Sequence, residues 1–280
     1  GANLSLRADL GAGTYRVAGP VRARGLQFDN IGVANGTARI DLFLGRAGAW
    51  RIGADLNGRI ARVTNSTLAA LAGPSIAVRG SLATGASRPI EFGNVRVTAA
   101  KLAMTLDGTV RDGRTVLAGR GRQSQYGPFT VEAGIDDNGP TAAFVFAEPA
   151  SGLSDVRLSL APSQDGFAMD ASGNSVLGPF DGAFGLTSRA GGPTLIDIER
   201  LRVSDTEVDG LVSLVDGGIR GTLSLAGGGL DGTIGLAPRG GGQGLVLDLT
   251  ARNARFEGVG GLAIARGEVD ARGIIAAGRT

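Results

Sequence analysis

The chain has 280 residues, of which 49 are glycine and none is cysteine or histidine. Without cysteine it has no disulfide scaffold, thiolate metal site or iron–sulfur cluster, and without histidine it has no Ser-His-Asp triad or ordinary zinc site. Basic and acidic residues nearly balance at a formal charge of +2, and basic residues do not cluster with aromatics as in a nucleic-acid groove, so no nucleic-acid partner is expected.

The apolar stretches of the chain are short. The longest, residues 259–265 and 273–278, fall far below the roughly 18 residues that a membrane-spanning helix needs. No signal peptide opens the chain, and residue 1 is glycine. We therefore expect these residues to be a piece of a longer polypeptide.

One segment near the middle of the first half is typical of a helix. Thr64, Asn65 and Ser66 supply an N-cap, good helix formers follow, and Gly73-Pro74 ends the pattern. The sequence predicts a helix of two turns at about residues 65–72.

Everything else is dominated by period-2 alternation, which is typical of half-buried strands. Apolar residues alternate with small, polar or charged ones at 102–106, 129–135, 156–160, 223–225, 234–236 and 245–249. Ten Asp-Gly or Asn-Gly dipeptides are interpreted as tight turns between strands, because these pairs favour positive φ angles. They begin at Asn35, Asn57, Asn138, Asp107, Asp112, Asp165, Asp181, Asp209, Asp216 and Asp231. The spacing predicts about 20 mostly antiparallel strands.

A weak internal repeat supports one continuous architecture. Tyr126-Gly127-Pro128-Phe129 resembles Leu177-Gly178-Pro179-Phe180, and each precedes an alternating segment. No linker divides the chain, so residues 1–280 are interpreted as a single segment. Because an open sheet rarely exceeds about ten strands without curling or layering, we expect an all-β fold. An elongated, bent, mostly antiparallel sheet with an apolar interior and one short helix fits best, because bulky aromatics are scarce.

The alternation also predicts which side chains line a hydrophobic groove on that sheet. Thr105, Glu132, Arg157, Ser224, Thr233 and Asp248 should point to solvent, because adjacent side chains on a strand leave opposite faces. The predicted groove residues are Leu102, Met104, Leu106, Phe129, Val131, Val156, Leu158, Leu160, Leu223, Leu225, Ile234, Leu236, Leu245, Leu247 and Leu249. The same residues could instead form a dry β core.

No motif predicts catalysis, a cofactor or a metal ion. The G-x-G-x-x-G match at residues 227–232 precedes another strand instead of a helix, and the calcium-type start at 241–244 lacks its aspartate at Val246. Asp136-Asp137 is interpreted as a turn and Asp197 with Glu199 as the solvent face of a strand, although paired carboxylates also occur in glycosidases. Lys101 lacks the serine of a Ser-x-x-Lys motif, because Thr98 stands in its place.

Two stretches resemble the central region of the TamB family, the translocation and assembly module subunits related to AsmA-like proteins. They are residues 95–108, followed by Gly119-Arg120-Gly121 and Tyr126-Gly127-Pro128, and residues 223–232, continuing through 248–254 to 264–267. The resemblance covers most of the chain.

This resemblance implies a periplasmic protein anchored in the inner membrane by a segment outside the chain. It implies a long β-trough ("β-taco") with a hydrophobic interior, a partner barrel of the Omp85 type in the outer membrane, and a role in outer-membrane protein assembly or phospholipid transport. Phospholipid acyl chains would be the ligand, without an enzymatic reaction. Two alternatives stay open: a β-solenoid passenger or adhesin, and a carbohydrate-active β-helix enzyme.

Overall fold

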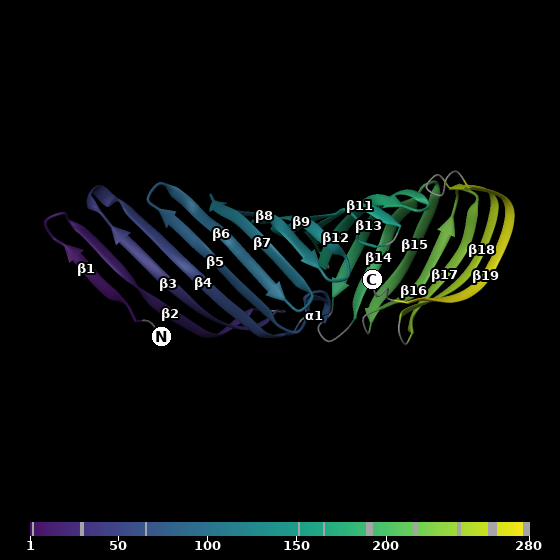
Figure 1. The fold of residues 1–280 in the computed structure, drawn as a ribbon. Coiled ribbons are helices and arrows are strands. Elements are labelled where there is room, and N and C mark those ends of the chain that lie inside the picture. Colours follow the sequence, from purple (N-terminus) through teal and green to yellow (C-terminus); the bar gives the residue numbers. More distant parts are fainter. Residues whose placement is uncertain are drawn as a thin grey trace. The chain divides into compact units, whose positions relative to one another are not determined.

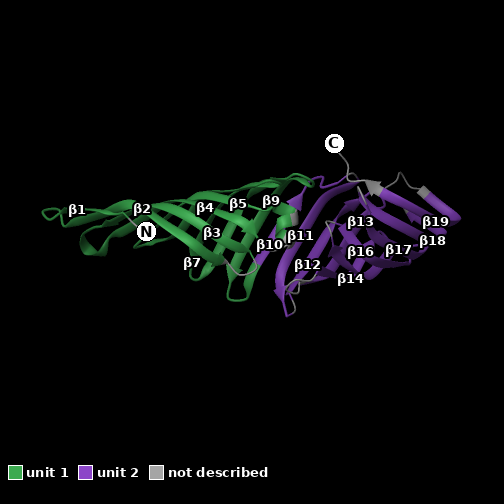
Figure 2. Cartoon of the chain, turned by 90° about the horizontal axis from the view of Figure 1, so that it is seen from below, with its two compact units in different colours: residues 1–140 green, residues 141–280 purple. Residues whose placement is uncertain are grey.

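The computed structural model describes residues 1, 3–28, 31–64, 66–150, 152–164, 166–188, 193–215, 218–239, 242–256 and 262–276. The chain divides into two compact units, Gly1–Pro140 and Thr141–Thr280, which are coloured separately in Figure 2. No change of composition marks this boundary in the sequence, and it falls within a strand.

The described part of unit 1 is built from strands, with one α-helix and one short 3₁₀ turn (Figure 1). The helical pieces are η1 (Arg46–Gly48), which the sequence does not predict, and α1 (Ser66–Ala72). The strands are β1 (Ser5–Asp9), β2 (Thr14–Phe28), β3 (Gly32–Leu44), β4 (Trp50–Val63), β5 (Ile76–Gly85), β6 (Arg88–Ala99), β7 (Leu102–Arg111), β8 (Arg114–Gln123) and β9 (Gly127–Asp136).

Unit 2 is built in the same way, from strands that follow one another in chain order (Figure 1). They are β10 (Gly139–Phe146), which begins at the boundary, β11 (Leu153–Ser163), β12 (Gly166–Ser175), β13 (Gly178–Ser188), β14 (Thr194–Val203), β15 (Thr206–Val215), β16 (Gly218–Ala226), β17 (Leu230–Arg239), β18 (Gly242–Phe256) and β19 (Leu262–Ala276).

Within each unit, every strand pairs antiparallel with the next strand of the chain. Among the described residues no ladder joins the first strand of a unit to its last, so neither sheet is closed. The predicted all-β, mostly antiparallel fold with one short helix is confirmed. A β-helix, in contrast, stacks its rungs in parallel.

The tight turns were only partly predicted. The Asp112-Gly113 pair has φ angles of 52° and 76° and closes the β7–β8 hairpin, as a two-residue turn requires. Of the pair at 138–139, Asn138 lies in a turn and Gly139 begins β10. The dipeptides at 165–166 and 216–217 reach outside the described residues, so their turns are not described.

Six predicted turns are wrong because the dipeptide lies inside a strand, with its carboxylate or amide residue on one face and glycine on the other. The pairs at 35–36 and 57–58 lie within β3 and β4, and those at 107–108, 181–182, 209–210 and 231–232 lie within β7, β13, β15 and β17. Alternation alone places the two residues on opposite faces. The glycine therefore serves as a small face residue.

The predicted helix is confirmed over Ser66–Ala72, while Asn65 lies outside the described residues. α1 connects β4 to β5 in place of a hairpin turn. Ala72 of the helix forms a small buried cluster with Val63 and Ile76, and Leu68 packs against this cluster. The backbone N–H of Lys101 donates to the carbonyl of Ala72 at 2.9 Å, which joins the helix to the β6–β7 turn.

Candidate functional site

The strand registers of unit 1 separate its side chains onto two faces. Leu106 on β7 lies opposite Val95 on β6 and Gly119 on β8, and Gly119 in turn lies opposite Val131 on β9. Residues directly opposite each other in a ladder share a face. A row is a series of residues that pair directly across successive strands. From β1 to β9, the rows on this side contain no Asp, Glu, Arg or Lys among the described paired residues. We call it the apolar face of unit 1.

Unit 2 has an equivalent apolar face. Leu223 on β16 lies opposite Gly210 on β15 and Ile234 on β17, and Ile234 lies opposite Leu247 on β18. From β10 to β19, the described paired residues in these rows again include no charged side chain. The charged side chains of both sheets lie on the opposite side, here called the outer face.

All fifteen residues predicted from the alternation occupy these apolar faces. Those of unit 1 are Leu102, Met104, Leu106, Phe129 and Val131. Those of unit 2 are Val156, Leu158, Leu160, Leu223, Leu225, Ile234, Leu236, Leu245, Leu247 and Leu249. Thr105, Glu132, Arg157, Ser224, Thr233 and Asp248 occupy the outer faces. Of these six, all but the half-buried Thr105 are exposed.

Sequence reasoning missed the apolar face of β1 to β6. Ile40, Leu42 and Ile52 belong to it, as do Val78 and Val97. The sequence did carry the signal, because apolar and polar residues alternate along these strands as well. Long strands with bulges and glycines, such as β2 and β3, blur that period over their full length.

Glycines on the apolar faces lie opposite large side chains. A Cβ atom on Gly119 would lie 2.0 Å from the carbonyl oxygen of Thr105 and 2.9 Å from Leu106. A Cβ atom on Gly232, whose φ is 142°, would lie 2.1 Å from the carbonyl oxygen of Asp248. Real side chains do not fit at such distances, so the closeness of neighbouring strands requires glycine there.

The internal repeat of residues 126–129 and 177–180 also reflects a glycine that lies opposite a large side chain. Phe129 lies opposite Gly121 of the preceding strand, and Phe180 lies opposite Gly173 of its preceding strand. A Cβ on Gly121 would lie 2.5 Å from the Phe129 ring, and one on Gly173 would lie 3.0 Å from the Phe180 ring. Each copy of the repeat therefore places a phenylalanine ring over a glycine gap on an apolar face.

The apolar faces are not covered as a closed core would be. The accessible surface of the chain is 17921 Å², whereas a compact monomer of this mass exposes roughly 11,000 Å² by the usual scaling. No large side chain among the described residues is less than 2% exposed. Most of the fifteen residues are half-buried, and only Leu106, Phe129, Val131 and Val156 are buried.

Hydrogen-bonded polar residues mark one end of each apolar face. In unit 1, the Gln123 side chain donates to the carbonyl of Leu71 at 3.1 Å and accepts from the N–H groups of Gln125 and Tyr126. In unit 2, the Gln243 side chain accepts from the N–H of Ile219 and donates to its carbonyl, both at 2.8 Å. Their polar atoms are therefore satisfied.

Electrostatic interactions belong to the outer faces. Asp41 accepts two hydrogen bonds from Arg16, and this contact, supported by the charges of Arg16 and Arg51, holds the pKa of the Asp41 carboxyl below its usual range. The other ion pairs among the described residues, Arg200–Asp181 at 4.0 Å and Arg202–Glu207 at 3.3 Å, are also exposed. Exposed pairs of this kind contribute little to stability.

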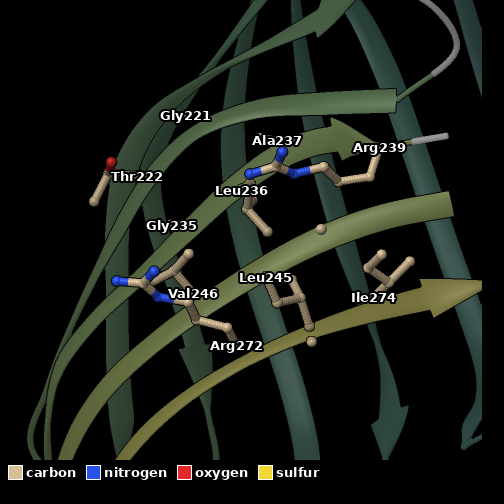
Figure 3. A pocket seen from close by; sticks show the side chains of 12 residues that line it. Gly221, Thr222, Gly235, Leu236, Ala237, Arg239, Leu245, Val246, Arg272 and Ile274 are labelled. Carbon is tan, nitrogen blue, oxygen red and sulfur yellow. The ribbon is translucent and has the colours of Figure 1, made fainter.

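Each unit has a hollow in contact with its apolar face. That of unit 1, about 280 Å³, lies over the glycines Gly36 and Gly58 and is walled by Val21, Leu56 and Val78. The hollow of unit 2 is about 680 Å³ and forms at β16–β19, beside the last described pair of the β16–β17 ladder, Gly221–Leu236. Its lining combines Leu236 and Leu245 of the apolar face with Arg239 and Arg272 of the outer face (Figure 3).

The motifs weighed for catalysis take structural positions. Residues 227–229 form the β16–β17 turn, and Asp136 accepts a hydrogen bond from the N–H of Asn138 at 2.9 Å within a turn. Asp197 and Glu199 are exposed on the outer side of β14. In the part of the chain that the structure describes, no group of three acidic residues could hold a metal ion. Gly241, in the calcium-type match, lies outside that part.

No helix in the described residues is long and apolar enough to cross a bilayer. Comparisons of the chain with protein-family models, with curated proteins and with solved structures find no match.

Proposed function

We propose that the chain is a segment of a periplasmic, inner-membrane-anchored protein whose apolar faces carry phospholipid acyl chains in support of outer-membrane biogenesis. The observation that carries the proposal is an apolar face in each unit that crosses every strand, has no charged side chain among its described paired residues and stays partly exposed. An ordinary core would bury the same residues completely.

The energetics favour such a surface as a carrier. Each acyl CH₂ group exposed to water costs about 0.8 kcal/mol, so a chain of about 16 carbons costs on the order of 10 kcal/mol. A face of half-exposed Leu, Ile and Val side chains lowers that cost at every step without a reaction or a cofactor. The absence of charges matters equally, because a buried unpaired charge against an acyl chain would cost several kcal/mol.

Other parts of the proposal rest on the resemblance to the TamB family. They are the periplasmic location, the anchor outside this chain, assistance to outer-membrane protein assembly, and docking to an Omp85-type barrel through parts outside this chain. An apolar face could also accept the hydrophobic strands of a client protein.

Site-specific photo-crosslinking tests the lipid role. A benzophenone amino acid is placed at Leu225 or Ile234 on the apolar face and, as matched controls, at their strand neighbours Ser224 or Thr233 on the outer face. The chain is purified from cells, irradiated and analysed by mass spectrometry for phospholipid adducts. We expect adducts at the two apolar positions in several-fold excess over the two controls. Equal labelling of both faces, or none at all, would refute the proposal.

A further inference from the structure

The outer face of unit 1 gathers arginines that are dispersed in the sequence. In one register row, Arg79 on β5 lies directly opposite Arg96 on β6, and Arg96 lies opposite Thr105, which lies opposite Arg120 on β8. The row continues through Asn57 and Thr37 to Arg22 on β2. At about 4.8 Å per strand, it runs roughly 29 Å from β2 to β8.

The neighbouring row, nearer the edge of the sheet that carries α1, adds Arg59 on β4 and Arg122 on β8. We call these two rows the arginine rows. No Asp or Glu occurs among their described members, and all six arginines are exposed. The nearest carboxylates of this face, Asp55, Asp107 and Glu132, belong to the next row, and none forms an ion pair with these arginines.

Such an arrangement is unfavourable for the sheet on its own, because like charges directly opposite each other repel. It suits an extended anionic surface, since guanidinium groups bind phosphate oxygens through two parallel hydrogen bonds. A hollow of about 340 Å³ lies within the rows. Arg22, Arg24 and Arg59 line it together with Asn35, Thr37 and Asn57, and no acidic residue does.

An exposed aliphatic residue accompanies the arginines on the outer face at the same edge, which favours a lipid surface over other polyanions. Val33 at the start of β3 lies opposite Arg62 on β4 and is 45% exposed. Neither row contains an aromatic side chain on which nucleic-acid bases could stack. Basic residues beside exposed aliphatic ones are typical of surfaces that bind the headgroup region of anionic bilayers.

We propose that the arginine rows dock unit 1 on the phosphate-bearing headgroups of an anionic bilayer. The hollow beside Arg22 and Arg59 would seat one headgroup phosphate. This proposal concerns the outer face alone and does not depend on lipid transport along the apolar faces.

Vesicle co-sedimentation tests the proposal with the full chain. Vesicles of phosphatidylcholine with a quarter of phosphatidylglycerol are compared with vesicles of phosphatidylcholine alone, at low and at high salt. We expect binding to the anionic vesicles only, with release at high salt because screening shortens the reach of each charge. Replacing Arg79, Arg96 and Arg120 together by Gln should lower partitioning on the order of 100-fold, since each cation near such a surface contributes about a factor of five.

The control is a triple variant with the same charge change at the other edge of unit 1, Arg88, Arg111 and Arg114 to Gln, which should bind nearly as the parent chain does. All six positions are exposed, so circular dichroism should show unchanged folding. Equal losses in both variants would show that net charge alone drives binding and would overturn the proposal. So would binding to neutral vesicles, or retention of a single-stranded oligonucleotide without retention of anionic vesicles.

Discussion

Replacing Leu247 by aspartate separates an open apolar face from a dry core. Leu247 is half-buried on β18, between Ile234 on one side and Ala271 on the other. Full burial of a leucine side chain is worth about 1.5–3 kcal/mol, so the half-buried side chain contributes about 1–2 kcal/mol. On an open face the new carboxylate keeps its water, and the total loss should be about 2 kcal/mol. In a closed core, an unpaired carboxylate would add several kcal/mol more.

The assay is equilibrium unfolding in urea, followed by circular dichroism at pH 7. Because domains are stable by about 5–15 kcal/mol, Leu247→Asp should still fold. The control is Val246→Asp on the same strand, since Val246 is 44% exposed on the outer face and lies opposite Arg272. It should change the free energy of unfolding by less than about 1 kcal/mol. A loss above about 5 kcal/mol for Leu247→Asp, with the control unaffected, would refute an open face.

The same substitution has a functional readout. Ile234 lies directly opposite Leu247, so a charge at 247 should lower lipid crosslinking from a benzophenone at 234 several-fold while the segment remains folded. Unchanged crosslinking in the folded variant would mean that acyl chains do not follow this row.

Three further outcomes are expected. Gly119→Val should destabilise unit 1 by at least about 3 kcal/mol in urea unfolding, because its Cβ would lie 2.0 Å from a neighbouring carbonyl oxygen, whereas Gly53→Ala, with nothing within 4 Å, should change stability by less than about 1 kcal/mol. Gln243→Ala should cost about 1–3 kcal/mol, because it leaves backbone groups of β16 without their partners. Arg16 lowers the pKa of Asp41, so this pair's contribution is present above the unfolded pKa of about 3.9 and is lost as the pH falls through the lower folded value. The difference in urea midpoint between the parent chain and Asp41→Asn should therefore shrink below about pH 4, and a constant difference would contradict this pairing.

Local pattern was sufficient for the faces of the strands that alternate cleanly. Side chains of a strand alternate between its two faces. The sequence alone therefore places Leu245, Leu247 and Leu249 on one face, even when the paired strands are unknown. The helix at Ser66–Ala72 was equally readable, because its cap and its Gly-Pro stop lie within a few residues of one another.

The same local reasoning failed for Asp-Gly pairs inside strands. The dipeptide Asp231-Gly232 is compatible with a hairpin turn. It is equally compatible with a strand that places the aspartate on the outer face and the glycine on the apolar face. Which one applies depends on the strand across the ladder: Gly232 lies opposite Leu225 on one side and Leu249 on the other, and only a residue without a side chain fits there. That information is not local.

The sequence by itself determined the all-β class, the short helix and the two faces of the cleanly alternating strands, because each depends on neighbours within a few residues. Only the tertiary structure decided what each face assembles. Arg79, Arg96 and Arg120 are far apart in the chain, and register alone brings them into one row. The openness of the apolar faces was likewise undecidable from alternation, because a dry core and an exposed face have the same period of two. What distinguishes them is whether another layer covers the face, and that depends on contacts between residues distant in the chain.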